Sequence, residues 1–306
     1  TRHNFSQSEN LGGCKILTLN FLLRLRRIEN LDKINMPELP EVETIKRQLN
    51  NRIRGRKIKE VEVNLPKFVR YPLNQFKKLV KGAVIKNVKR RAKLLIIELS
   101  NGYSLVVHLK LTGQLVFNGQ NNKHTHLIYT FTDKNWLVHN DLRQFGFVKV
   151  VAKKDLNSFF IKESFGPEPL NKEFTFDLFK SLLNKRKKSK IKPLLMDQKF
   201  VAGIGNIYAD EILFRAKVLP IRKVNDLEIG EVRKIYQAIK EILTLAVKKR
   251  GSSNKDYVDT KGGKGSYSFL QKVYQRKNKA CFKCKAKIKR IKLGSRSAHF
   301  CPQCQK

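Results

Sequence analysis

The stretch LLIIELSNGYSLVVHLKL, Leu94 to Leu111, decides the fold of the first half of the chain, because two apolar runs flank an Asn-Gly pair. Short apolar runs bounded by Gly, Asn or Asp are typical of strands. Runs of this kind recur along the chain: Ile58–Leu65, Val84–Lys89, Leu94–Leu99, Ser104–Leu111, His126–Phe131, Trp136–His139 and Phe145–Val151. Strands at this spacing predict an antiparallel β-sandwich or barrel.

Helical patterns flank this β-rich region. Before it, Pro40 occupies a position that suits the first turn of a helix, and apolar residues follow at helical spacing as far as Ile53. The turn-rich segment SFGPEPL, Ser164–Leu170, follows the strands and precedes a second, mostly helical domain. Its helical segments are Phe174–Leu183, Ile191–Asp197, Ile207–Ala216 and Glu228–Lys249. Ser252–Ser268, which has few large apolar residues, is expected to be a mobile loop.

The composition indicates a globular protein that binds a polyanion. The chain has 306 residues, 41% of them hydrophobic, and 65 Lys and Arg against 25 Asp and Glu, a net charge of +40. The apolar fraction excludes a disordered or fibrous chain, and the length predicts about two domains. No apolar run reaches the roughly 18 residues of a membrane span, so we expect a soluble protein without a membrane partner.

The first residues follow a different pattern from the rest. Thr1–Asn35 contains the apolar run Lys15–Ile28, which is interrupted by three arginines and has no clean signal-peptide core. A basic amphipathic targeting helix is one interpretation. We favour the alternative, that residues 1–36 are a non-native extension translated from upstream of the true start.

Four of the five cysteines lie in the spacing Cys281-x2-Cys284-x16-Cys301-x2-Cys304. Two such pairs joined by a hairpin-length linker are typical of tetrahedral zinc, with two disulfides or buried thiols as the alternatives. Four thiolates close the coordination sphere, so one zinc ion would stabilise the hairpin without activating water. The linker is rich in Lys and Arg, which favours contact with phosphate.

The stretch VAGIGNIYADE, Val201–Glu211, places Gly203 and Gly205 just before a helix that is expected to begin near Asn206. Free backbone amides at a helix N-terminus bind anions, so this turn predicts a phosphate site. A packing corner between two helices is the alternative.

The segment PELPEVE, Pro37–Glu43, offers an unusual nucleophile. If Met36 is the start and is removed, Pro37 has a free secondary amine, and terminal amines titrate near 7.7 to 8. Such an amine could attack a carbonyl-like carbon while the neighbouring Glu38 transfers protons. The alternative is that Glu38, Glu41 and Glu43 only stabilise the N-terminus of a helix.

Taken together, several motifs strongly resemble bacterial formamidopyrimidine-DNA glycosylase from Met36 to Lys306: MPELPEVETIKRQL, HLKLTGQL, LRQFG, IKPLLMDQKFVAGIGNIYADEILFRAKVLP and the four-cysteine finger. PELPEVE separates this branch from the endonuclease-eight enzymes, which usually read PEG. The resemblance implies an α+β fold with an N-terminal antiparallel β-sandwich and leading helix (37–165), a helix-two-turns-helix domain with a lesion-capping loop (166–270) and a zinc-finger β-hairpin (271–306).

The resemblance also implies the activity. The expected enzyme is a glycosylase and AP lyase that binds damaged double-stranded DNA as a monomer in the bacterial cytoplasm, at the nucleoid. It would flip an oxidised purine, 8-oxoguanine or a formamidopyrimidine, out of the duplex and excise it. Pro37 would form the Schiff base and Glu38 would be the general acid, with β and δ elimination following.

Further residues take roles by matching family motifs. Lys93 in RRAKLL would lie beside the lesion, where a solvated cation is the alternative. Phosphate contacts are carried over to His108, Lys110, Lys192, Asn206 and Arg296. Phe145 would intercalate in the duplex, and Arg143 would read the base opposite the lesion. The loop Lys255–Tyr267 would close over the flipped base.

The chain departs from the family pattern at a few positions. Leu111 replaces a Met in the wedge, and Leu142 and Gln144 replace a Pro and an Arg, so we expect a slightly altered opposite-base preference. With residue 36 attached, Pro37 is an amide and cannot form an iminium. A catalytically dead DNA-binding homologue therefore remains as one alternative. A related endonuclease-eight-like enzyme that acts on oxidised pyrimidines is the other.

Overall fold

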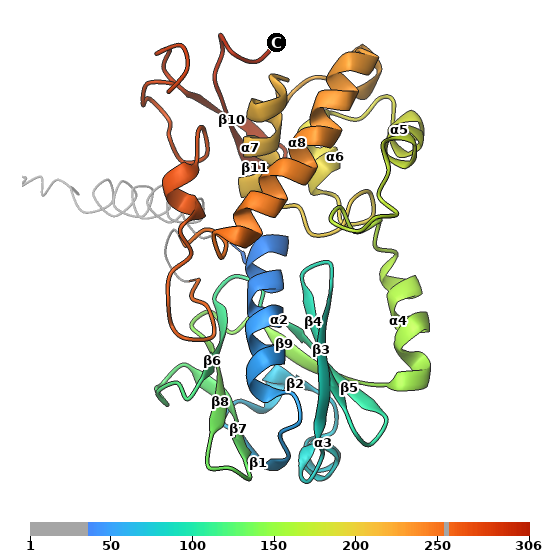
Figure 1. The fold of residues 1–306 in the computed structure, drawn as a ribbon, viewed down its shortest axis with the longest axis vertical. Helices are drawn as coiled ribbons and strands as arrows, with labels where there is room; N and C mark the ends of the chain where they lie inside the picture. The colour runs from blue at the N-terminus through green and yellow to red at the C-terminus, as the bar shows by residue number, and fades with distance from the viewer. Residues whose placement is uncertain (1–35, 254–256) are drawn as a thin grey trace, which may run out of the picture. The chain divides into compact units, whose positions relative to one another are not determined.

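The computed structural model describes residues 36–253 and 257–306 (Figure 1). The predictions for residues 1–35, and the part of the expected loop at 254–256, lie outside the described residues. In the part of the chain that is described, no helix is both long and apolar enough to cross a membrane.

Helix α2, Leu39–Ile53, lies between the two parts of the fold in Figure 1. Pro40 is in its first turn, as predicted, and its apolar stripe is fully buried. Leu39 packs into the core of the helical domain, whereas Val42, Ile45 and Leu49 pack into the core of the β domain. One helix therefore contributes to both cores, which fixes its first residues at the junction.

The β domain is the predicted sandwich of two sheets. The four-stranded sheet has the order β1 (Ile58–Val63), β7 (Thr125–Phe131), β8 (Trp136–Asp141), β6 (Gly113–Phe117). The five-stranded sheet has the order β2 (Val69–Arg70), β9 (Phe147–Ala152), β5 (Tyr103–His108), β4 (Leu94–Leu99), β3 (Ile85–Arg91). All pairs are antiparallel except β2 with β9, and the apolar faces of both sheets share one core with α2.

The sequence patterns missed several short elements of this domain. Strand β2 has only two residues, and edge strand β6 begins at the glycine of the turn-like pair Thr112–Gly113. Two short helices were also missed, α3 (Leu73–Val80) and α4 (Leu156–Glu163). Single turns of 3-10 helix are Pro66–Phe68, Lys153–Asp155, Val224–Asp226 and Tyr267–Leu270.

The helical domain has the four predicted helices, α5 (Phe176–Asn184), α6 (Ile191–Met196), α7 (Asn206–Ala216) and α8 (Ile229–Lys248). Helix α7 is buried on nearly all sides and packs against α6, α8 and the C-terminal hairpin. The hairpin consists of β10 (Lys289–Leu293) and β11 (Arg296–Phe300), joined through Gly294 at φ +62°. These elements complete the α+β fold expected from the sequence.

The segment Ser252–Ser268 differs from the expectation of a mobile loop. Among its described residues, Tyr257, Asp259, Thr260 and Tyr267 are at most 5% exposed. Tyr257 and Tyr267 pack into the two hydrophobic cores, and buried hydrogen bonds hold the polar residues between them, so the polar composition did not predict the placement of this segment.

Candidate active site

The carboxylate of Glu38 lies at the N-terminus of α7, where the sequence predicted a bound phosphate. It accepts hydrogen bonds from the backbone N–H groups of Gly205 at 2.7 Å and Ile207 at 2.9 Å. The prediction of a phosphate site on these amides is therefore wrong in this structure, because a carboxylate of the same chain takes the anion's place. Glu38 is only 3% exposed, and the burial raises its pKa although Lys93 and the amides lower it.

The two glycines of the turn make room for this contact. A Cβ on Gly205 would lie 2.4 Å from Cδ of Glu38, and a Cβ on Gly203 would lie 2.6 Å from Cβ of Leu39. Gly203 also has φ +88°, and its carbonyl accepts the N–H of Leu39 at 3.0 Å. The GxG pattern therefore lets the start of α2 approach the start of α7.

Glu41 connects the same junction to the chain after α8. Its carboxylate accepts the N–H of Glu38 at 2.8 Å, the hydroxyl of Tyr208 at 2.6 Å and the N–H of Ser252 at 2.7 Å. Glu38 is the N-cap residue of α2 and Glu41 closes its capping box, as the helix-cap interpretation of PELPEVE expects, while the Glu38 carboxylate also caps α7. Burial, followed by the charge of Glu38, raises the pKa of Glu41 to about 7.

Pro37 and Lys93 lie beside these carboxylates. Pro37 is buried, immediately before Glu38. Lys93 follows Ala92, which has φ +52° in the turn between β3 and β4. Burial lowers the pKa of Lys93, and the charges of Glu38 and Glu41 act in the opposite direction. The structure therefore brings the three predicted catalytic residues to one place.

His108 and Lys110 lie at the end of β5. The ring Nδ1 of His108 accepts the backbone N–H of Lys110 at 3.0 Å, so Nε2 carries the proton of the neutral ring. Burial, followed by the charges of Lys110 and Lys93, lowers the pKa of His108 to about 3. A neutral imidazole that donates from Nε2 can bind a phosphate oxygen without being charged.

Lys192 and Asn206 are in direct contact. The ammonium of Lys192 donates to Oδ1 of Asn206 at 2.7 Å and to the carbonyl of Ser297, and it pairs with Asp210 at 2.8 Å. Lys192 is 1% exposed, and these partners account for its three donors. Lys192 thus orients Asn206 and β11 in this structure, while Arg296, at the start of β11, is exposed.

The predicted wedge residues lie on two neighbouring turns. Phe145 is 51% exposed, and the guanidinium of Arg143 lies 5.0 Å from the centre of its ring. The backbone N–H of Arg143 donates to Oγ1 of Thr112 at 2.9 Å. This bond joins the turn of Arg143 and Phe145 to the turn that carries Leu111. An apolar tip and a cation held side by side suit insertion into stacked bases.

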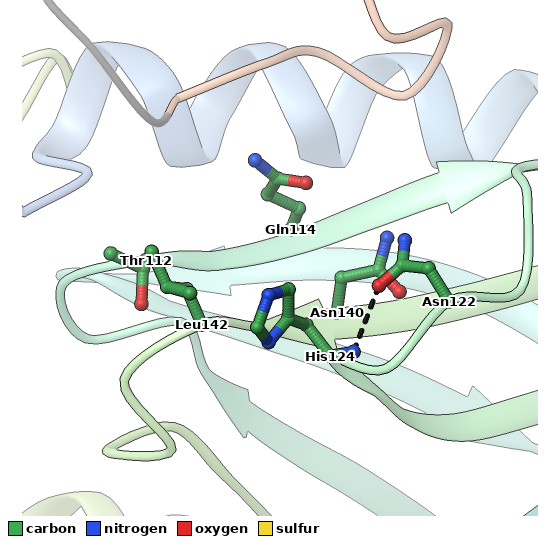
Figure 2. A pocket seen from close by; sticks show the side chains of 6 residues that line it. All are labelled: Thr112, Gln114, Asn122, His124, Asn140 and Leu142. Carbon is green, nitrogen blue, oxygen red and sulfur yellow. Dashed lines mark hydrogen bonds between the residues drawn. The ribbon is translucent and has the colours of Figure 1, made fainter.

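A polar pocket borders this wedge. It is lined by Thr112, Gln114, Asn122, His124, Asn140 and Leu142 (Figure 2). Thr112 contributes both to this pocket and to the position of the Arg143 turn. Sequence reasoning did not find the pocket, because its residues come from strands β6 and β8 and from the turns and the loop that adjoin them.

The four predicted zinc ligands converge at the C-terminus. Their Sγ atoms all lie within 4.8 Å of one another, with Cys281 to Cys304 at 3.9 Å and Cys284 to Cys301 at 3.4 Å. Tetrahedral zinc with Zn–S bonds of about 2.3 Å requires sulfurs about 3.8 Å apart. The donor set fits one structural zinc ion, which would hold the hairpin that carries Arg296.

Sequence reasoning missed several residues that position the site. Asp141 is fully buried and accepts the N–H groups of Arg143 at 3.2 Å and Gly146 at 2.7 Å, so it shapes the wedge turn. Glu211 accepts three backbone N–H groups, at Lys272, Val273 and Tyr274, and thereby holds the chain that enters the finger. Asp141 directly precedes the LRQFG motif and Glu211 ends the quoted stretch VAGIGNIYADE, and these positions were the only signal that the sequence offered.

The fold and the site define a zinc-finger DNA repair enzyme of the glycosylase class. Three family models match in order along the chain: the formamidopyrimidine-DNA glycosylase N-terminal domain at residues 36–148, the H2TH domain of the same enzymes at 165–257, and the zinc finger found in FPG and IleRS at 278–306. The chain belongs to the formamidopyrimidine-DNA glycosylase family.

Curated relatives and solved structures agree with this assignment. The chain is 43% identical over 275 residues to the formamidopyrimidine-DNA glycosylase of Pelotomaculum thermopropionicum, covering 89% of this chain and 99% of the relative. It is 39% identical to that of Streptococcus mutans, with 89% and 100% covered. The Lactococcus lactis Fpg bound to DNA with an abasic site superposes with a TM-score of 0.83 at 37% identity, covering 88% of this chain and 99% of that one.

Proposed function

We propose that the chain excises oxidised purines, 8-oxoguanine and formamidopyrimidines, from duplex DNA and then cleaves the abasic strand. Pro37 acts as the nucleophile and Glu38 as the general acid, with Lys93 beside the lesion. The observation that carries this proposal is the buried Glu38 carboxylate, fixed on the amides of Gly205 and Ile207 directly after Pro37.

The excision step uses the free secondary amine of Pro37. Its lone pair forms a bond to C1′ of the deoxyribose, the glycosidic bond breaks, and the base leaves with the bonding electrons and takes up the proton that the Pro37 nitrogen loses. Protonated Glu38 then donates to O4′ as the C1′–O4′ bond opens, which yields an iminium at C1′. The raised pKa of Glu38 favours the protonated acid that this step requires.

The lyase steps follow from the iminium. It acidifies the C2′ proton, and loss of this proton expels the 3′ phosphate by β elimination. A second loss, at C4′, expels the 5′ phosphate by δ elimination. Each step removes a proton and breaks one C–O bond, so no metal is needed in the reaction and zinc only maintains the fold.

We propose that the cations hold the DNA and that the wedge opens it. His108, Lys110, Asn206 and Arg296 bind backbone phosphates, with Lys192 acting through Asn206. Phe145, Leu111 and Arg143 occupy the space left by the flipped nucleotide. Solved relatives are described as complexes with DNA that contains an abasic site or carbocyclic 8-oxo-G. The enzyme acts as a monomer in the bacterial cytoplasm.

Borohydride trapping tests this proposal. A protein that begins at Met36 and one that begins at Thr1 are each mixed with a duplex carrying one 8-oxoguanine opposite cytosine. We expect a covalent adduct at Pro37 for the Met36 protein after removal of Met36. Absence of an adduct from both proteins, with DNA binding intact, would overturn the nucleophile assignment and favour a DNA-binding role alone.

Oxidised pyrimidines are a second candidate substrate class, because one Lactococcus lactis relative is described in complex with DNA containing an oxidised pyrimidine. The Met36 protein is therefore also given thymine glycol in the same duplex. Faster excision of 8-oxoguanine supports the purine assignment, and faster excision of thymine glycol contradicts it.

A further inference from the structure

The loop between α5 and α6 is a run of cations. Lys185–Lys190 reads KRKKSK, so five of its six residues are Lys or Arg, and all five are exposed. Among the described residues, none of these five cations is in an ion pair, and the ion pairs of the helical domain are formed by other cations, such as Lys192 and Arg222. The loop therefore carries positive charge that no described carboxylate neutralises.

Backbone contacts fix this loop against residues 221–226, which follow α7. The N–H of Asn225 donates to the carbonyl of Lys187 at 3.0 Å, and Lys190 forms an isolated antiparallel bridge with the exposed Lys223. Together the two stretches hold seven cations and one carboxylate. We call the loop and Lys223 the second basic surface. Its cations are held together by the fold and do not depend on a bound partner for their placement.

The second basic surface and Glu38 are attached to opposite ends of α7. Glu38 accepts N–H groups at the N-terminus of this helix, and its 11 residues span about 16 Å to Ala216. Beyond Ala216 the chain turns back, and the carbonyl of Arg222 accepts the N–H of Ile191 at 2.8 Å. Ile191 directly follows the lysine loop. The second basic surface is therefore joined to the chain that leaves the C-terminal end of α7, away from the end that holds Glu38.

The chemistry of this surface suits the backbone of duplex DNA. Lys and Arg bind phosphates without reading bases, and each neutralised phosphate releases a counterion, which drives binding. Neither stretch contains an aromatic residue on which unpaired bases could stack, which argues against a single-stranded ligand. We therefore expect contacts with the phosphates of a double strand and no sequence preference.

We propose that the second basic surface binds a second segment of duplex DNA while a first segment occupies the candidate active site. The inference goes beyond the proposed excision chemistry and requires only that the chain binds DNA at that site. A protein held by two segments can release the first without leaving the DNA altogether, so it moves directly from one segment to another. The rate of such a transfer rises with the concentration of the second segment, whereas simple dissociation is independent of it.

Charge reversal at two exposed lysines tests the surface without disturbing a core. The test variant combines Lys187→Glu with Lys188→Glu. The matched control combines Lys77→Glu with Lys78→Glu, at exposed positions of α3, and changes the net charge by the same amount. All proteins begin at Met36, and zinc content and thermal unfolding are measured for each.

The probe is a short labelled duplex with a reduced abasic site, which has no aldehyde for the amine of Pro37 to attack. The rate at which the protein leaves this duplex is measured against rising concentrations of an unlabelled, undamaged duplex. For the wild type and the control, we expect the rate to rise steadily with the competitor concentration. For the test variant, we expect this slope to fall by about tenfold, with the affinity for the labelled duplex alone unchanged.

Other outcomes would overturn the inference. A wild-type rate that does not change with the competitor would show that no second segment takes part. An equal loss in the control would assign the effect to net charge, and a loss of affinity for the labelled duplex alone would place the surface on the first duplex. A single-stranded competitor that accelerates release as much as the duplex does would contradict a duplex surface.

Fluorescence energy transfer gives a second readout of the same complex. The abasic duplex carries the donor dye and the undamaged duplex, in excess, carries the acceptor. We expect energy transfer with the wild type and the control and its loss with the test variant, and no transfer with the wild type would contradict the inference. Neither measurement uses excision, so a failure of the proposed glycosylase chemistry leaves this test intact.

Discussion

The carboxylate of Glu38 accepts the backbone N–H of Gly205 at 2.7 Å, although the two residues are 167 positions apart in the sequence. This contact fixes the residue after Pro37 to the N-terminus of α7, a helix that is buried on nearly all sides. The proton donor of the proposed reaction is therefore positioned by the core of the other domain.

Gly205→Ala should disable this contact. The added Cβ would meet Cδ of Glu38 at 2.4 Å, so the carboxylate must move away from the amides. We expect excision of 8-oxoguanine to fall by about 100-fold, while duplex binding persists. Gly230→Ala is the control, because a Cβ there meets nothing within 4 Å. Normal excision by Gly205→Ala would show that the contact between Glu38 and the α7 amides is not needed for excision.

Glu41 should make stability depend on pH. Its pKa is raised from 4.5 to about 7, so between these values the folded protein holds a proton that the unfolded chain has lost. Protonated Glu41 therefore stabilises the fold fully below pH 4.5. This contribution to the unfolding free energy, about 3 kcal/mol, is lost as the pH rises through 7.

The difference in unfolding free energy between wild type and Glu41→Gln isolates this contribution from the other titrating groups. Urea unfolding from pH 4.5 to 8 measures it. The wild type should lose stability relative to Glu41→Gln as the pH rises, and a constant difference would show that Glu41 is ionised throughout.

Removal of zinc should abolish DNA binding, because the hairpin that carries Arg296 would lose its support. Strand β11 supplies the Ser297 carbonyl to Lys192, and the ring Nδ1 of His299 pairs with Asp210 at 3.0 Å. Cys301→Ser should therefore lose both the zinc ion and duplex affinity. Metal analysis and a binding titration measure the two effects. Both substitutions are made in the protein that begins at Thr1, where Cys14→Ser, outside the four-cysteine motif, is the control. Tight binding by zinc-free Cys301→Ser would show that the finger is dispensable.

Asp141→Asn should disturb the wedge turn. The carboxylate accepts N–H groups of Arg143 and Gly146 on its two oxygens, and an amide can accept on only one. We expect weaker discrimination among the bases opposite the lesion and less unstacking, measured with 2-aminopurine beside the lesion. Asp226→Asn, at an exposed aspartate, is the control. Unchanged discrimination would mean that Arg143 is positioned without Asp141.

The sequence by itself predicted most of the elements and the zinc ligands. Apolar runs, helical periodicity and the four-cysteine spacing reflect local geometry, so they predicted all strands of the β domain except β2 and β6, the helices α2 and α5 to α8, and the four cysteines. The segment PELPEVE drew attention to Pro37 and Glu38 as a possible nucleophile and proton donor, whereas Lys93 was singled out only by the family resemblance, and the roles of all three remain predictions.

Only the tertiary structure decided which polar groups are hydrogen-bond and ion-pair partners of one another. The amides after Gly203 predicted an anion, and the folded chain supplies Glu38 from the other domain as that anion. Lys192 was expected to contact a DNA phosphate, and in the structure its ammonium is surrounded by acceptors of the same chain. Asp259 belongs to the expected mobile loop and is fully buried. Hydrogen-bond partners far apart in the sequence leave no local periodicity, so their pairing emerges only when both cores have packed around α2.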